Sequence, residues 1–214
     1  MKNRLLFTAL LVIVCIATGA MVSLIVSRHQ EAKSTANSGI AGLLWPNPRS
    51  LMPFTVTDHL GRPFGLDQLS GKWSFLFFGF THCPDVCPIT LTVLKDFYGK
   101  LVNENAAGDV QVIFVTVDPA RDTREQVANY IRYFNEKFIG LTGTDEQIAA
   151  LAQQIGVIFY KADNNEDYAV DHSASVFLIS PAGKWVGLFS APHNAEDMRV
   201  RFNAIRKFID SQNK

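Results

Sequence analysis

The chain lacks a surplus of charge of either sign and has few cysteines. Its 214 residues carry 20 Lys and Arg against 20 Asp and Glu, so no net field would attract a polyanion, and we expect no nucleic-acid partner. Three cysteines are too few for a disulfide scaffold. Hydrophobic residues make up 48% and charged residues 19%, which excludes an intrinsically disordered chain. If the cysteines have a role, it is therefore a chemical one.

One apolar segment differs from the rest of the chain. Residues 5–26 contain no charged side chain and, at about 1.5 Å per residue, can cross a hydrocarbon layer of about 30 Å. The segment predicts an uncleaved transmembrane helix rather than a cleaved signal peptide, whose apolar region is about 7 to 15 residues long. Cys15 lies within this span, and we assign it no role.

The flanking charges give the orientation of this span. Lys2 and Arg4 precede it, Arg28 and Lys33 follow it, and the amino terminus adds one positive charge to the first side. We therefore expect the N-terminus inside and the following domain outside. Only four residues precede the span, too few for an Arg-rich transit peptide. We expect a single-pass protein of a bacterial plasma (inner) membrane with its domain on the periplasmic face.

Composition divides the chain into three parts. Residues 1–27 form the predicted anchor. Residues 28–52 form a polar tether followed by an irregular segment, because Pro46 and Pro48 lack a backbone donor and fix their φ angles. Residues 53–214 form the folded domain.

Apolar runs and amphipathic segments alternate along this domain. The predicted strands cover residues 54–57, 63–66, 73–80, 110–117, 157–160, 175–179 and 185–189. The predicted helices cover 88–105, a segment after Thr123 that ends at Phe134, a segment after Thr144 that ends near Ile155, and 194–210. This pattern predicts an α/β fold with a mixed sheet and helices on both faces. Sites in such sheets lie beyond the carboxyl ends of the strands.

Two cysteines follow the first core strand. Cys83 and Cys87 are four residues apart at the expected start of a helix, where one turn places both side chains on one face. The positive end of the helix dipole should lower the proton affinity of both sulfurs. A pair of thiolates forms either a soft metal chelate or a redox couple. A structural disulfide and two packing cysteines are the plainer alternatives.

A histidine precedes another predicted strand. His172 lies just before the strand at 175–179, where it should face a neighbouring loop. Alone, such a histidine is more often structural. Together with a dithiolate it suits copper, because thiolates select Cu(I) and an imidazole also allows Cu(II). A structural zinc site would need a fourth protein ligand, and none is obvious.

Three motifs together resemble the Sco/SenC family: residues 78–88 (FGFTHCPDVCP), 117–123 (VDPARDT) and 171–173 (DHS). The resemblance implies a thioredoxin-like fold on a membrane tether, with copper bound by Cys83, Cys87 and His172. It also implies a copper chaperone that receives copper from an upstream donor. Its client would be subunit II of cytochrome c oxidase, whose dinuclear copper centre it helps to assemble.

Other residues in or near these motifs have no firm role. Asp85 and Asp118 could support the ligands or dock a partner. We expect His82 to be a solvated side chain that points away from Cys83, and His59 and His193 to lie at the surface.

An enzyme is the alternative to a chaperone. The same two cysteines could serve a thiol-disulfide oxidoreductase or a thiol peroxidase, or could reduce the copper-site cysteines of the client. Thioredoxin-type enzymes use CxxC and a proline just before the strand that faces the site, whereas this chain has CxxxC and no proline there. A peroxidase also needs a nearby Arg or Gln, which the cysteine loop does not supply. We therefore favour a non-enzymatic copper carrier.

Overall fold

The computed structural model describes residues 18, 21, 44–161, 170–172 and 174–212. Residue contacts divide the chain into two compact units, Met1–Ala41 and Gly42–Lys214, and the fold described below belongs to the second unit. In the described part of the chain, no helix is both long and apolar enough to cross a membrane. The anchor predicted at 5–26 lies outside the described residues apart from Thr18 and Met21, as does most of the tether.

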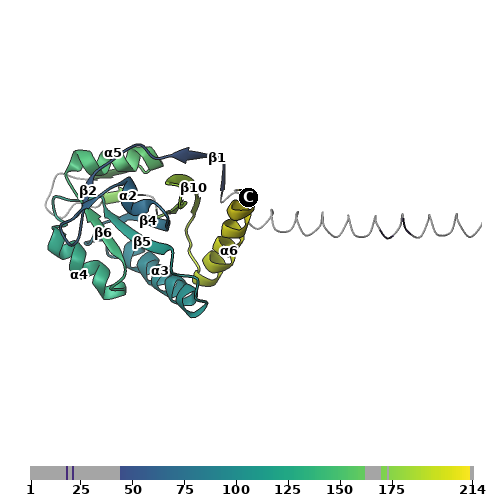
Figure 1. Cartoon of the computed structure of the whole chain (residues 1–214). Helices are drawn as coiled ribbons and strands as arrows, with labels where there is room; N and C mark the ends of the chain where they lie inside the picture. Colours follow the sequence, from purple (N-terminus) through teal and green to yellow (C-terminus); the bar gives the residue numbers. More distant parts are fainter. Residues whose placement is uncertain (1–17, 19–20, 22–43, 162–169, 173, 213–214) are drawn as a thin grey trace, which may run out of the picture. The chain divides into compact units, whose positions relative to one another are not determined.

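A mixed eight-stranded sheet forms the centre of this unit (Figure 1). Its strands, in order across the sheet, are β1 (Leu44–Ser50), β10 (Lys184–Phe189), β9 (Val176–Ile179), β4 (Trp73–Gly79), β5 (Val110–Thr116), β6 (Ile139–Thr142), β2 (Val56–Asp58) and β3 (Pro63–Phe64). Strands β4, β5 and β6 are parallel, and β9 is antiparallel to β4. Two further strands, β7 (Phe159–Lys161) and β8 (Val170–His172), pair with each other. The predicted α/β class with a mixed sheet is confirmed.

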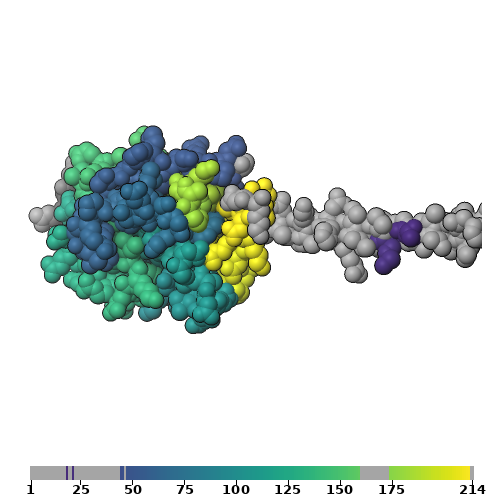
Figure 2. Space-filling model, in the orientation of Figure 1, coloured from purple at the N-terminus to yellow at the C-terminus, as the bar shows by residue number. Residues whose placement is uncertain are grey.

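Helices cover the sheet on both sides, which explains why every residue of β4 and β5 is buried. The helices are α2 (Leu66–Leu69), α3 (Val86–Asn103), α4 (Arg124–Phe134), α5 (Asp145–Ile155) and α6 (Ala195–Gln212). The ring centre of Phe75 on β4 lies 4.7 Å from the ring centre of Phe97 on α3 and 5.0 Å from that of Phe202 on α6. Figure 2 shows α6, in yellow, beside the teal surface of α3. Helix α5 lies on the opposite side of the sheet (Figure 1).

The structure corrects three local predictions. Residues 44–50 form strand β1 and not an irregular segment. This strand pairs with β10 alone, at the edge of the sheet, where a proline without an N–H group is tolerated. Strand β6 and helix α2 were not predicted, because four residues are too few to show a period. Helix α3 begins at Val86, before Pro88, because proline fits the first turn of a helix.

Candidate metal centre

The two cysteines lie together where β4 passes into α3. Cys83 is in the connecting loop and is partly exposed, whereas Cys87 is the second residue of α3 and is fully buried. Both side chains are thiols, and a side-chain hydrogen bond joins them. The backbone N–H of Cys83 donates to the carbonyl of Phe80 at 3.2 Å, which folds the loop back onto the end of the strand. The predicted convergence of the two sulfurs is confirmed.

The proton affinity of Cys87 differs from the expectation. The hydrogen bond with Cys83 is the first cause that raises the pKa of the Cys87 thiol, burial is the second, and the negative charge of Asp122 adds to them. A backbone hydrogen bond at Phe80 acts in the opposite direction but is outweighed. The prediction that the helix start lowers the proton affinity of both sulfurs is therefore wrong for Cys87. A metal ion must displace the proton of this buried thiol.

A buried carboxylate holds the cysteine loop in place. Asp122 is fully buried and accepts hydrogen bonds from the N–H of Thr81 at 2.9 Å, from the Thr81 hydroxyl at 2.5 Å and from the Thr116 hydroxyl at 2.6 Å. These bonds join the loop after β4 to the end of β5. Sequence reasoning used Asp122 only as part of a helix-capping signal and missed this role. Its place in the 117–123 motif was the one available signal.

Glycine at position 79 makes room for the buried sulfur. A Cβ atom there would lie 2.9 Å from Cys87 Sγ and 2.9 Å from a ring carbon of Phe114. Both contacts are closer than side chains allow, so only glycine lets β4 pass beneath the start of α3. The sulfur of Cys87 and the ring of Phe114 thus both lie close to the backbone at Gly79.

The other acidic residues of the motifs differ in burial. Asp118 is fully buried and accepts a hydrogen bond from Nε of Arg121 at 2.5 Å. The guanidinium carbon of Arg121 lies 5.9 Å from the ring centre of Phe80, so this pair supports the base of the cysteine loop. Asp85 is exposed at the N-cap of α3, and among the described residues its side chain caps no helical N–H.

The histidines are placed differently from the expectation. His82 is 48% exposed, but its Nδ1 lies 3.4 Å from Asp122 Oδ1, so it is not simply solvated. His59 and His193 are half-buried instead of lying at the surface. His59 Nδ1 accepts from the N–H of Gly140 at 3.2 Å, and burial lowers its pKa. His193 Nε2 lies 2.7 Å from the carbonyl oxygen of Ala174, which ties the segment before β9 to the start of α6.

The backbone brings His172 to the same edge of the sheet as the cysteines. His172 ends β8, and Val176 at the start of β9 lies opposite Phe77, two residues before the end of β4. Cys83 follows four residues after that end. The side chain of His172 lies outside the described part of the structure. Among the described side chains, no three of His, Cys, Asp and Glu gather to hold a metal ion.

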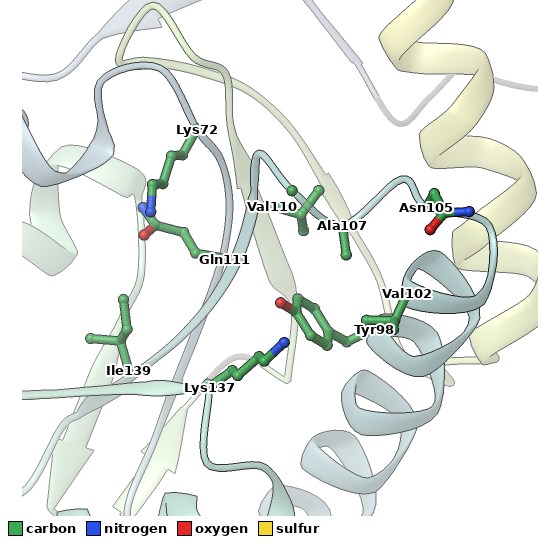
Figure 3. Close-up of a pocket in the computed structure, with 10 residues that line it drawn as sticks. Lys72, Tyr98, Val102, Asn105, Ala107, Val110, Gln111, Lys137 and Ile139 are labelled. Carbon is green, nitrogen blue, oxygen red and sulfur yellow. The ribbon is translucent and has the colours of Figure 1, made fainter.

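A hollow at the opposite end of the sheet has a different chemistry (Figure 3). It lies at the starts of β4 and β5, and Figure 3 shows the Lys72 and Lys137 side chains and the Tyr98 ring around it. Its lining residues include no thiol, imidazole or carboxylate. This hollow therefore does not offer the ligands of a copper site.

Several known proteins and solved structures are similar to this chain. A protein from Bos taurus, "Protein SCO2 homolog, mitochondrial", is 40% identical over 148 residues, which are 68% of this chain and 55% of that protein. The chain thus spans about half the length of this relative. The crystal structure of Arabidopsis thaliana ScoI with copper bound has a TM-score of 0.67 at 39% identity, covering 73% of this chain and 98% of that one. Yeast Sco1 with copper bound has a TM-score of 0.69 at 30% identity, covering 75% and 90%.

The family match includes the cysteine loop, the Asp122 loop and β8. The family model with the description SCO1/SenC matches residues 46–207, which is more than half of the chain. The thioredoxin-like fold that the sequence motifs implied is the fold of these solved relatives. The chain belongs to the SCO1/SenC family.

Proposed function

We propose that this protein is a copper chaperone that binds one copper ion through Cys83, Cys87 and His172. The observation that supports this most is the hydrogen-bonded pair of thiols at the end of β4, at the edge of the sheet where the His172 segment enters. Two sulfurs suit Cu(I), and an added imidazole also accommodates Cu(II). The copper-bound structures of similar proteins support the choice of metal.

The different exposure of the two sulfurs suits transfer of the ion. Cys87 is buried and held against Gly79, so it keeps its position throughout, whereas Cys83 is partly exposed. A thiolate of the client can therefore replace Cys83 first. The thiolates of the client replace the copper ligands of this protein one at a time, and only bonds to the copper ion are made and broken. Such a carrier needs no enzymatic turnover.

The client and the location belong to the same proposal. The client is subunit II of cytochrome c oxidase, where the ion enters the dinuclear copper centre, and an upstream donor supplies copper. Residues 5–26 anchor the chain once in a bacterial plasma membrane, with the copper domain on the periplasmic face; their uncharged composition supports this. Protease added to intact spheroplasts should degrade the domain. A domain that is degraded only after lysis would contradict the orientation.

Redox chemistry is the second candidate, and one observation favours it. A partly exposed Cys83 next to a buried Cys87 resembles an attacking thiol beside a resolving thiol. Such a dithiol could reduce the oxidised copper-site cysteines of the client before metallation. Against a thioredoxin-type enzyme, Ser175 and not proline precedes β9. Arg121 approaches the cysteine loop from another segment, so a peroxidase test is needed as well.

The experiment compares copper binding with thiol turnover in the full chain, purified in mild detergent with reduced cysteines. Wild-type protein should take up about one copper ion, show a sulfur-to-Cu(II) absorption band and metallate a subunit II copper domain. The band should disappear in His172→Ala and persist in His82→Ala, a matched control at the neighbouring histidine. Equal copper retention in His172→Ala would remove that histidine from the site. Rapid turnover of insulin or peroxide would instead favour the enzyme.

A further inference from the structure

One buried hydroxyl near the cysteines has no hydrogen-bond partner among the described residues. It belongs to Tyr130, on α4. The ring of Tyr130 packs against two phenylalanine rings. Its centre lies 5.5 Å from the ring centre of Phe114 and 5.3 Å from that of Phe134. Phenol groups in protein interiors normally bond to something, because a buried O–H without a partner destabilises the fold. The hydroxyl is therefore available for a group that comes into play when the site is loaded.

Packing places the Tyr130 side chain near the buried cysteine. The ring of Tyr130 packs on the ring of Phe114. A ring carbon of Phe114 and Cys87 Sγ both lie close to the backbone at Gly79. Burial raises the pKa of Tyr130 above its usual range, and negative charge on Cys87, Cys83 and Asp122 raises it further. The Tyr130 side chain therefore lies close to the buried sulfur.

Its partner is missing for a reason that the thiol pair explains. A side-chain hydrogen bond joins the Cys87 thiol to Cys83. A thiol sulfur is a weak acceptor, whereas a metal-bound thiolate accepts hydrogen bonds well. The carboxylate of Asp122 is already occupied by Thr81 and Thr116. The sulfur of Cys87 therefore becomes a stronger acceptor when copper binds.

We propose that Tyr130 is a positioning residue of the copper site: its hydroxyl donates a hydrogen bond to the Cys87 sulfur once that sulfur is a copper-bound thiolate. The inference rests on the proposed function, since it assumes that Cys87 is a ligand. A hydrogen bond to a thiolate ligand withdraws electron density from the sulfur, which favours Cu(I) over Cu(II) and raises the reduction potential. Tyr130 would thereby help the protein to hold the ion in the reduced form.

The test compares Tyr130→Phe with Tyr98→Phe in the full chain. Tyr98 is a matched control, because it is also a buried phenol but lies eleven residues beyond Cys87 on α3, beside the hollow at the other end of the sheet. Tyr130→Phe should still bind one copper ion. Its sulfur-to-Cu(II) band should move to lower energy and its reduction potential should fall. Its affinity for Cu(I) should drop about tenfold in chelator competition. Tyr98→Phe should match wild-type protein in all three measurements.

The outcomes separate this inference from the proposed function. Wild-type protein without a copper-dependent sulfur band would overturn both. A band and potential that Tyr130→Phe leaves unchanged would overturn only the role of Tyr130, even if the variant unfolds more or less easily, because packing alone would alter stability and not the spectrum. Tyr130→Phe removes a hydroxyl without a partner, so we expect it to fold as well as wild-type protein.

Discussion

Two buried carboxylates, Asp58 and Asp122, are satisfied in different ways. Asp58 accepts bonds from the N–H of Leu60 and from the N–H and Nε of Arg62, all within its own turn between β2 and β3. Asp122 is bonded by Thr81, 41 residues away in sequence, and by Thr116. The first carboxylate shapes a hairpin, whereas the second joins separate segments.

This difference shows which of the two carboxylates supports the candidate metal site. The charge of Asp58 is balanced by Arg62, whose side chain is 65% exposed, so a local turn supplies everything that this carboxylate needs. Asp122 is fully buried, and its bonds from Thr81 fix the loop that carries Cys83. Burial of such a group is costly unless its hydrogen bonds are made. Asp122 therefore stabilises the geometry of the cysteine loop in addition to the fold.

The largest expected effect is a loss of copper affinity on substitution of Asp122 but not of Asp58. Asp122→Asn should lower copper affinity about 10- to 100-fold, because the amide cannot accept all three bonds and the cysteine loop loosens. Asp58→Asn, the matched control, should bind copper like wild-type protein. Chelator competition measures both. An equal loss of copper affinity in both variants would show that Asp122 supports the copper site no more than Asp58 does.

The next effect concerns stability and its dependence on pH. Each of these substitutions should lower the free energy of unfolding at pH 7 by about 1–3 kcal/mol. For Asp58, burial raises the pKa, but the hydrogen bonds from Arg62 and Leu60 outweigh it and the net pKa is lowered from 3.8. Its stabilisation is therefore present above pH 3.8 and is lost as the pH falls through the lower, folded-state pKa. Urea unfolding of Asp58→Asn and wild-type protein should converge below pH 3.8; a constant difference would contradict this.

A pair of glycines tests the packing around the buried sulfur. Gly79→Ala should destabilise the fold by about 1–3 kcal/mol and weaken copper binding, because its methyl group would overlap Cys87 Sγ. Gly99→Ala on α3 meets nothing within 4 Å and should stabilise the helix by about 1 kcal/mol. Thermal unfolding measures both. A Gly79→Ala variant that is as stable as wild-type protein would show that Gly79 is not needed for close approach.

The smallest effect is expected at His82. Its side chain is half exposed, so its contact with Asp122 is screened by water, and His82→Gln should change stability by about 0.5 kcal/mol or less. Copper stoichiometry should stay the same. A loss as large as that of Asp122→Asn would show that His82 supports the loop and is not a peripheral partner.

The sequence predicted the parts of the site that depend on local spacing. Cys83 and Cys87 lie close together at their four-residue spacing, although Cys83 lies in the loop before α3 and not in its first turn, and α4 begins after Thr123 because its capping box is local. The bonds of Asp122 to Thr81 could not be foreseen, since they depend on how two loops meet. The raised pKa of Cys87 was missed because burial and the neighbouring sulfur outweigh the helix dipole.

The edges of the sheet were also hard to predict. Strand β1 contains Pro46 and Pro48, which favour irregular structure unless a partner such as β10 is available on one side. Strand β6 is short, and its position is fixed by pairing with β5 and β2 instead of by its own pattern. The placement of the His172 side chain stays a prediction from sequence.

X-ray absorption at the copper edge, measured on the full chain loaded with one Cu(I) equivalent, tests the proposed ligand set most directly. Wild-type protein should show scattering from two sulfurs and one imidazole nitrogen. Cys83→Ser and Cys87→Ser should each lose one sulfur, and His172→Ala should lose the imidazole contribution. Identical spectra from wild-type protein and His172→Ala, or a copper shell without sulfur, would contradict the account.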